Sequence, residues 1–251
     1  MDVDERDQVA QQFGVAPEQV ERDHLISYLL AYLSQHFGNR IHFIGGTALA
    51  RTHLTGGRLS EDIDLVVIDS RVAVARELDD ALPRAMARTH GRLALEPFFS
   101  TVADTVPVTV RTVEGMAVKI QLLSARDRIV WPAELRRIEQ RYSDAPAAEL
   151  TVPTLPAFAA SKTATWADRA APRDLWDLWA LSEIGAIDKT ALHLFLQFGP
   201  TNRPPGDYMF EKPPPDAAWQ AQLAGQTRLT IAASDALAIV RASWARVIST
   251  E

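Results

Sequence analysis

Hydrophobic residues recur with helical spacing between residues 23 and 37, where Leu25, Leu29, Tyr32 and Leu33 fall on one face. Gly38 and Asn39 follow directly and end the pattern. We predict a helix over 23–37. The same reasoning predicts a strand over 40–44, a tight turn at Gly45 and Gly46, a helix to about 53 and a flexible connection over 55–58. It then predicts a strand over 63–68, a helix over 71–89 and strands near 93–99, 106–113 and 115–123.

The pattern changes after residue 150. Residues 151–156 contain two prolines and are interpreted as a rigid connection. Beyond them strand signals nearly vanish, and helices are expected near 155–168, 172–184, 188–198 and 226–248. Two proline-rich stretches, 204–206 and 213–215, bound an insert that we predict to lack regular structure. The first half is therefore α/β and the second half mainly α-helical.

Composition narrows the chemistry. The chain has 251 residues, 47% of them hydrophobic, which is enough for a sizeable core. It has no cysteine, so disulfides and thiol chemistry are excluded and carboxylate, histidine, lysine and hydroxyl groups remain. No apolar run is long enough to span a bilayer, and the acidic start does not resemble a secretory signal, so we expect a cytoplasmic protein without a membrane partner.

Charge and tryptophan content also bear on partners. The net charge of -6 argues against non-specific coating of nucleic acid. Two groups of arginines, within 84–92 and 126–141, are interpreted as solvated helix faces, although a local basic track remains open. Five tryptophans in or beside predicted helices are expected in the core rather than as base-stacking platforms: Trp166, Trp176, Trp179, Trp219 and Trp244.

Two carboxylates are embedded in the apolar strand at 63–68 and its start. Asp62 and Asp64 project to the same face of a strand, about 7 Å apart. Such a pair is costly in an apolar strand unless a cation compensates its charge, and an all-oxygen site favours Mg²⁺. The alternative is that both acids lie at a strand end and cap a neighbouring turn.

The turn upstream strengthens the metal hypothesis. Gly45 and Gly46 free backbone N–H groups at the start of a helix, and Thr47 adds a hydroxyl, which together suit a phosphate group. A glycine pair alone more often marks an ordinary turn. The combination of strand, Gly-Gly-Thr, helix and Asp-x-Asp strand is much more specific.

These motifs carry a resemblance to a known family. The segment FIGGTALARTHLTGGRLSEDIDL resembles the first motif of the AbiEii/AbiGii abortive-infection toxins, which include the mycobacterial MenT toxins and belong to the nucleotidyltransferase superfamily. The likeness continues through SKTA at 161–164 and DRAAPRDLWDL at 168–178. It implies a nucleotidyltransferase-like α/β (α+β) domain with a mixed sheet over 1–150. A helical domain over 151–251 would contribute Lys162 and Asp177 to the cleft.

The second block also makes physical sense without the family. Pro172 suits the first position of a helix, so Arg173, Asp174 and Asp177 fall on its first turns. Lys162 and Arg169 share a face of the preceding helix and could hold phosphate, with Asp174 or Asp177 orienting Lys162 or the attacking hydroxyl. The alternative for each residue is a salt-bridge network between the helices, with Asp174 capping the second.

The resemblance implies a role for each matched residue. Asp62 and Asp64 hold Mg²⁺ and, with Lys162 and Asp177, form the catalytic set. Nucleotide-binding positions are Gly45, Gly46, Thr47, Ser60, Arg169, Arg173 and Asp174. The superfamily often places a third carboxylate on a later strand, where this chain has Gln121, so a full two-metal site is in question. We also hypothesise that phosphorylation of Ser60 silences the enzyme by competing for Mg²⁺, which predicts an inactive Ser60→Asp variant.

The expected function is nucleotide transfer from a nucleoside triphosphate to RNA. The mycobacterial relatives imply the tRNA 3′ end as acceptor, a block of translation, and an antitoxin encoded by a neighbouring gene. Two alternatives stay open: nucleotidylation of a protein or small molecule, slightly favoured by the acidic charge, and a degenerate nucleotide-binding or antitoxin-binding module, motivated by Gln121.

Overall fold

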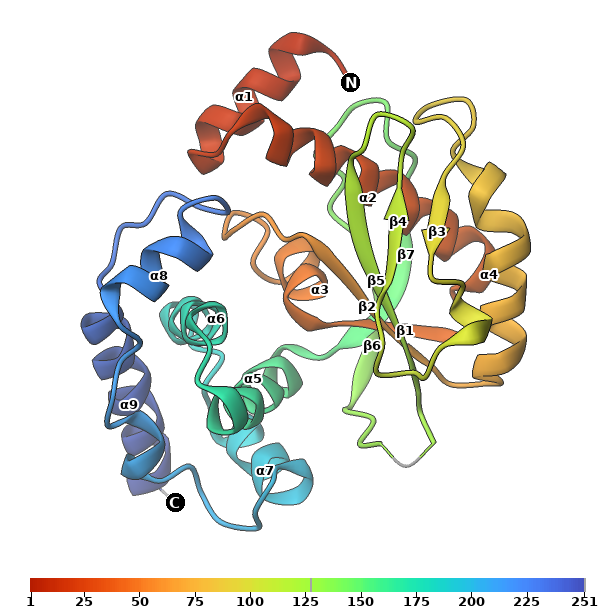
Figure 1. Cartoon of the computed structure of the whole chain (residues 1–251). Helices are drawn as coiled ribbons and strands as arrows, with labels where there is room; N and C mark the ends of the chain where they lie inside the picture. Colours follow the sequence, from red (N-terminus) through yellow and green to blue (C-terminus); the bar gives the residue numbers. More distant parts are fainter. Residues whose placement is uncertain (127, 251) are drawn as a thin grey trace. The chain divides into compact units, whose positions relative to one another are not determined.

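The chain folds into two compact units, Met1–Val152 and Pro153–Glu251 (Figure 1). The computed structural model describes residues 1–126 and 128–250. The sequence analysis placed the division between residues 150 and 151. Each unit is described by itself below.

The first unit contains a mixed sheet and its helices. Its elements, in chain order, are α1 (Val3–Phe13), α2 (Pro17–Phe37), β1 (Ile41–Ile44), α3 (Gly45–Thr52), β2 (Asp62–Val67), α4 (Arg71–Ala85), β3 (Ala94–Glu96), η1 (Phe99–Thr101), β4 (Val108–Arg111), β5 (Ala117–Ser124), β6 (Ala133–Arg137) and β7 (Glu149–Pro153). The predicted mixed sheet is thus confirmed.

Strand order in this sheet brings together segments that are far apart in the sequence. The described strands form one sheet in the order β3-β4-β5-β2-β1-β7-β6. β2 pairs antiparallel with β1 and parallel with β5, so Asp64 lies opposite Ile44 on one side and Gln121 on the other. The central strand β2 therefore carries the candidate carboxylates between the glycine turn and β5.

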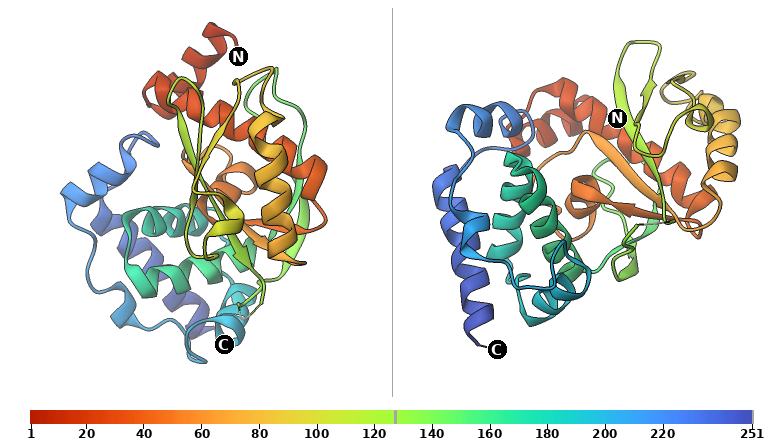
Figure 2. Two further views of the ribbon diagram at one scale, coloured as in Figure 1. Left: turned by 45° about the vertical axis from the view of Figure 1, so that its right-hand side comes forward. Right: turned by 60° about the horizontal axis from the view of Figure 1, so that its bottom comes forward.

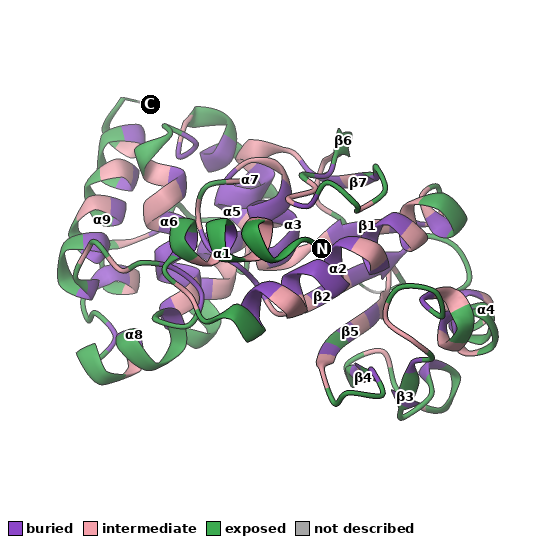
Figure 3. Ribbon diagram, turned by 90° about the horizontal axis from the view of Figure 1, so that it is seen from above, coloured by how far each residue is buried: buried purple, intermediate pink, exposed green. Residues whose placement is uncertain are grey.

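The hydrophobic core lies on one face of the sheet. Ile63 and Leu65 of β2 and Ile120 of β5 are at most 1% exposed. Helices α2 and α4 both contact β5 and run along the same side of the sheet (Figure 1, Figure 2). Much of α2 is buried, whereas α4 keeps an exposed outer side (Figure 3). Period-two alternation in β2 and β5 thus separates an apolar face from a polar one.

The second unit is helical. It comprises α5 (Leu155–Arg169), α6 (Pro172–Glu183), α7 (Lys189–Phe198), η2 (Asp207–Phe210), α8 (Asp216–Leu223) and α9 (Ala233–Ser249). Helix α6 packs against α5, α8 and α9, and α5 packs against α7. Trp166, Trp176, Trp219 and Trp244 are at most 5% exposed, as predicted, while Trp179 is half-buried.

Several sequence expectations were wrong in detail. Helix α2 begins at Pro17, helix α4 ends at Ala85, and the final helix begins only at Ala233. The rigid connection after 150 is partly strand β7, whose Thr151 pairs with His42 of β1. A proline is tolerated there because Pro153 is the last residue of its strand.

Other elements were missed altogether. Helix α1, strand β6 and helix α8 had no prediction, and the proline-rich insert contains the 3-10 turn η2. Helix α1 is held by tertiary packing, since its Val9 and Phe13 cluster with Leu59 and Tyr142 from distant segments. Within the described residues, no helix is both long and apolar enough to cross a membrane.

Candidate active site

The turn between β1 and α3 lies directly against the Asp64 carboxylate. Gly45 has φ +79°, and a Cβ atom added there would lie 2.3 Å from Asp64 Oδ2. Any other residue would therefore clash with the carboxylate as well as strain the backbone. The two motifs that the sequence analysis combined, Gly-Gly-Thr and Asp-x-Asp, are in contact.

Thr47 fixes the same turn to the start of β2. Its side chain is buried, and its hydroxyl donates a hydrogen bond to the backbone carbonyl of Asp62. The single hydroxyl proton of Thr47 is therefore used in this hydrogen bond to β2. The N-cap residue of α3 is Ile44, which offers no side-chain cap to the first N–H groups of the helix. These backbone groups at Gly45, Gly46 and Thr47 suit an anion, and their role in phosphate binding stays a prediction.

Asp62 and Asp64 share the polar face of the sheet with two residues of β5. Parallel pairing sets Asp62 opposite Lys119 and Asp64 opposite Gln121. Both aspartates and Gln121 are half-buried and Lys119 is exposed, whereas the intervening residues Ile63 and Ile120 are buried. Oxygen donors and one ammonium group thus gather on this face.

Gln121, the predicted counterpart of a third carboxylate, lies on β5. Its Nε2 donates a hydrogen bond of 3.0 Å to the carbonyl of Thr105. The amide can offer its neutral Oε1 and one remaining N–H to this face, but no negative charge. Among the described residues there is no group of three or more His, Cys, Asp or Glu side chains placed to hold a metal ion.

The connection before β2 is packed from Arg58 to Ser60, whereas Gly56 in the predicted flexible connection over 55–58 is exposed. Arg58, Leu59 and Ser60 are 3%, 0% and 7% exposed. Glu61 accepts a hydrogen bond of 2.8 Å from Arg22 of α2. Because Ser60 is buried, a kinase could reach its hydroxyl only if this segment opened, and the phosphorylation hypothesis stays a prediction.

A buried ionic cluster, here named the Asp23 network, supports α3 from within the first unit. It comprises Asp23, Arg51, Arg141 and Tyr142. Arg51 and Arg141 form ion pairs of 2.9 and 3.4 Å with Asp23, and the Tyr142 hydroxyl donates to Asp23 Oδ2 at 2.9 Å. Burial lowers the pKa of Arg51 to about 10. Arg141 was expected on a solvated helix face and is instead 6% exposed in this network.

The second unit holds four of the predicted site residues in another cluster, the Lys162 network. Lys162 Nζ lies 3.2 Å from Asp174 Oδ1 and 2.6 Å from Asp177 Oδ2. Arg169 donates two hydrogen bonds to Asp174, of 2.7 and 3.0 Å. The side chains of Asp174 and Asp177 are 0% and 3% exposed, whereas Arg169 is 59% exposed. The predicted salt-bridge network between these helices is therefore present.

Arg173 is not part of this network. It is half-buried on α6, and no hydrogen bond or ion pair of the described residues joins it to Lys162, Asp174 or Asp177. Pro172 occupies the first turn of α6, as its rigid φ predicts.

A family model described as "Nucleotidyl transferase AbiEii toxin, Type IV TA system" matches residues 28–246. The chain belongs to this AbiEii family. Among solved structures it is similar to MenT4, the nucleotidyltransferase toxin Rv2826c from Mycobacterium tuberculosis H37Rv, with 24% identity and a TM-score of 0.70. That similarity covers 98% of this chain and 90% of the other and shows the shared fold. Curated proteins gave no match.

The family match makes the chain a nucleotidyltransferase of the toxin–antitoxin class, which implies a nucleoside triphosphate substrate and a cognate antitoxin. The resemblance predicted from the two motif blocks is thus confirmed. The assignment of individual residues rests on the geometry above and stays a prediction.

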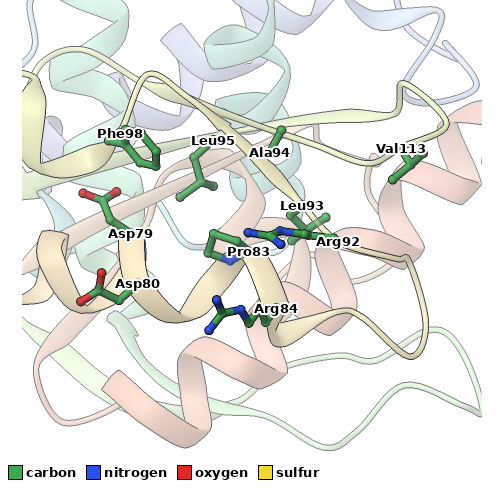
Figure 4. A pocket seen from close by; sticks show the side chains of 10 residues that line it. All are labelled: Asp79, Asp80, Pro83, Arg84, Arg92, Leu93, Ala94, Leu95, Phe98 and Val113. Atoms are coloured by element: carbon green, nitrogen blue, oxygen red, sulfur yellow. The ribbon is translucent and has the colours of Figure 1, made fainter.

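One pocket of this AbiEii protein lies away from the aspartates. A cavity of about 660 Å³ opens between α4 and β3, with an apolar floor that includes Pro83, Leu95 and Phe98. Arg84 and Arg92 line it together, and Asp79 and Asp80 lie toward its other end (Figure 4). Arg92 follows the end of α4 at Ala85, so the expected continuous helix face of arginines is not formed. None of the predicted site residues lines this pocket.

Lys119 is the residue of the polar face that the sequence analysis missed. The signal was available in the segment VKIQLL, where alternation puts Lys119 and Gln121 on one face. Its relation to Asp62 required the parallel register of β2 and β5.

Proposed function

We propose that this AbiEii toxin transfers a nucleotide from a nucleoside triphosphate to RNA, with the 3′ end of tRNA as acceptor, and so blocks translation. The contact between the Gly45 turn and the Asp64 carboxylate carries the proposal, because backbone N–H groups that suit an anion lie beside a carboxylate that suits a cation. The family supports the reaction class.

The residues on β2 fit a divalent cation. Asp62 and Asp64 supply hard carboxylate oxygens, which Mg²⁺ prefers, and the absence of a Cβ at Gly45 lets Asp64 Oδ2 pack against the turn. Two carboxylates satisfy part of an octahedral shell, and phosphate and water oxygens commonly complete it. A bound Mg²⁺ would neutralise charge that develops on the phosphate.

The proposed reaction conserves atoms and charge. An RNA hydroxyl oxygen forms a bond to the α-phosphorus, the bond from that phosphorus to the bridging oxygen breaks, and pyrophosphate leaves with the electron pair. The hydroxyl proton passes to a carboxylate of the site and then to water. Backbone N–H groups at the start of α3 hold phosphate oxygens during this change.

We further propose that Lys162 and Asp177 are required for the same transfer. The support is their match to the second family motif and the retention of a buried ionic pair 2.6 Å apart. A buried pair of this kind adds little to stability compared with apolar residues, so its presence favours a functional role. We place the reaction in the cytoplasm, with an antitoxin from the neighbouring gene controlling it.

The test incubates the purified protein with Mg²⁺, total RNA and each labelled nucleoside triphosphate in turn. We expect label in the tRNA fraction, and a loss of at least about 100-fold in Asp62→Ala. Asp69→Ala is the matched control, because Asp69 is an exposed carboxylate just after β2. Thermal melting confirms that both variants are folded. Absence of label with every nucleotide and acceptor, from folded wild-type protein, would refute the proposal.

A second candidate is nucleotidylation of a protein or small molecule, which the net charge of -6 favours over RNA binding. The same labelling experiment in a cell extract distinguishes the two. Label in protein or in small molecules, with none in RNA, would support this alternative.

A further inference from the structure

Lys119 lies beside the proposed metal-binding carboxylates. It is in parallel register with Asp62, on a strand whose axis is about 4.8 Å away. In-register residues of neighbouring strands project to the same face of a sheet. The buried neighbours Ile63 and Ile120 occupy the opposite face, which confirms that Lys119 shares the face of the aspartates.

Because residue 121 is a glutamine, this face of the sheet carries less negative charge than it would with a third carboxylate at that position. It is in register with Asp64, and its Nε2 is held by the Thr105 carbonyl. The position beside Asp64 therefore presents a neutral oxygen. Two carboxylates and a neutral amide attract a second divalent cation less strongly than three carboxylates would, and an ammonium group beside them repels it further.

We propose that Lys119 supplies a positive charge beside Asp62, and that Asp62 and Asp64 hold one divalent cation. This inference rests on the proposed nucleotidyl transfer for its catalytic part. During nucleotide transfer the ammonium group of Lys119 stabilises the negative charge that develops on phosphate oxygens. A second cation has this role in two-metal enzymes. Lys119 forms no covalent bond, and the bond changes are those given above.

The first experiment measures Mn²⁺ binding to the full-length, nucleotide-free protein by titration calorimetry. We expect one Mn²⁺ per chain for the wild type. Lys119→Met removes a repulsive charge and should bind Mn²⁺ about three- to ten-fold more tightly. The same variant should lose about 10- to 100-fold in nucleotide transfer, because its stabilising charge is gone.

Two further variants serve as controls. Lys119→Arg keeps the charge and should retain the Mn²⁺ affinity and most of the activity. Lys212→Met removes an exposed lysine from the helical unit and should change neither measurement. A merely structural lysine would instead weaken metal binding and activity together when replaced by methionine.

A gain-of-charge variant tests the cation count. Gln121→Glu restores a third carboxylate, and we expect a second Mn²⁺ equivalent or at least a ten-fold gain in affinity. The inference is overturned if the wild type binds two Mn²⁺ or none, or if Lys119→Met fails to tighten binding. If the wild type binds one Mn²⁺ but transfers no nucleotide, the proposed function fails and the charge balance at Asp62 stands.

Discussion

The Asp23 network and the Lys162 network are both built from buried carboxylates and basic side chains, yet they differ in how far their cations are shielded from solvent. In the Asp23 network one carboxylate meets two arginines and a tyrosine, and Arg51 and Asp23 are each 1% exposed. In the Lys162 network two carboxylates share one buried lysine, and the other cation, Arg169, is 59% exposed.

We interpret this difference as separating a structural role from the functional role proposed for the Lys162 network. In the Asp23 network, Arg51 also donates to the carbonyls of Asp23 and Glu139, so it joins α2, α3 and the segment before β7. This cluster positions α3 and is closed to solvent at Asp23 and Arg51. In the Lys162 network the lysine contacts two carboxylates and the second cation is exposed to solvent, an arrangement that suits a residue set exchanging charge with a substrate.

The largest expected effect is loss of stability in Asp23→Ala. Removing Asp23 leaves two buried arginines without their carboxylate, which should lower the free energy of unfolding by about 3–5 kcal/mol. Chemical denaturation measures this change. Asp80→Ala, an exposed carboxylate on α4, is the control and should change stability by at most about 0.5 kcal/mol. Equal stability of the two variants would show that the Asp23 network is not a structural support.

A smaller loss of stability, with a large loss of activity, is expected for Lys162→Met. The variant removes the lysine that lies 2.6 Å from the buried Asp177 carboxylate and should lose about 2–3 kcal/mol of stability. The double variant Lys162→Met/Asp177→Asn removes the uncompensated charge, so we expect it to regain most of the stability and none of the activity. Unfolding curves and nucleotide transfer are measured on the same preparations. Recovery of transfer in the double variant would contradict a role for this pair in the reaction.

The smallest effect is a dependence of stability on pH. Neither network contains a histidine, whereas the first unit holds a pair of histidines in contact. His90 Nε2 lies 3.0 Å from His24 Nδ1, and His24 Nε2 lies 3.0 Å from Asp144. Burial and the neighbouring His24 lower the pKa of His90 from 6.5 to about 4.

The sign follows from proton binding. Below pH 6.5 the His90 side chain binds a proton in the unfolded chain but stays neutral in the folded protein. Its contribution to stability is therefore fully present above pH 6.5 and is lost as the pH falls toward 4. Allowing for partial solvent screening, we expect a loss of about 1 kcal/mol. His90→Gln should flatten this dependence in denaturation experiments at pH 7 and pH 5. An unchanged slope would assign the titration to another group.

Local signals in the sequence were sufficient for much of the fold and of the site motifs. Apolar periodicity located α2, α4, α5, α6 and α7, and alternation located β2 and β5. Strand β7 was not predicted because Pro153 indicated a linker. Helix α1 was not predicted because its stability comes from packing against the distant Leu59 and Tyr142. The secondary-structure propensity of a short segment contains no information about such long-range packing.

The sequence by itself determined that a Gly-Gly-Thr turn precedes an Asp-x-Asp strand, and that a Lys162 helix precedes a helix bearing Asp174 and Asp177. These features depend on neighbours a few residues apart, where backbone geometry is local. The tertiary structure decided that Gly45 touches the Asp64 carboxylate, that Lys119 stands beside Asp62, and that Arg141 is buried against Asp23. Those relations join segments separated by long stretches of chain, and strand register and core packing alone set them.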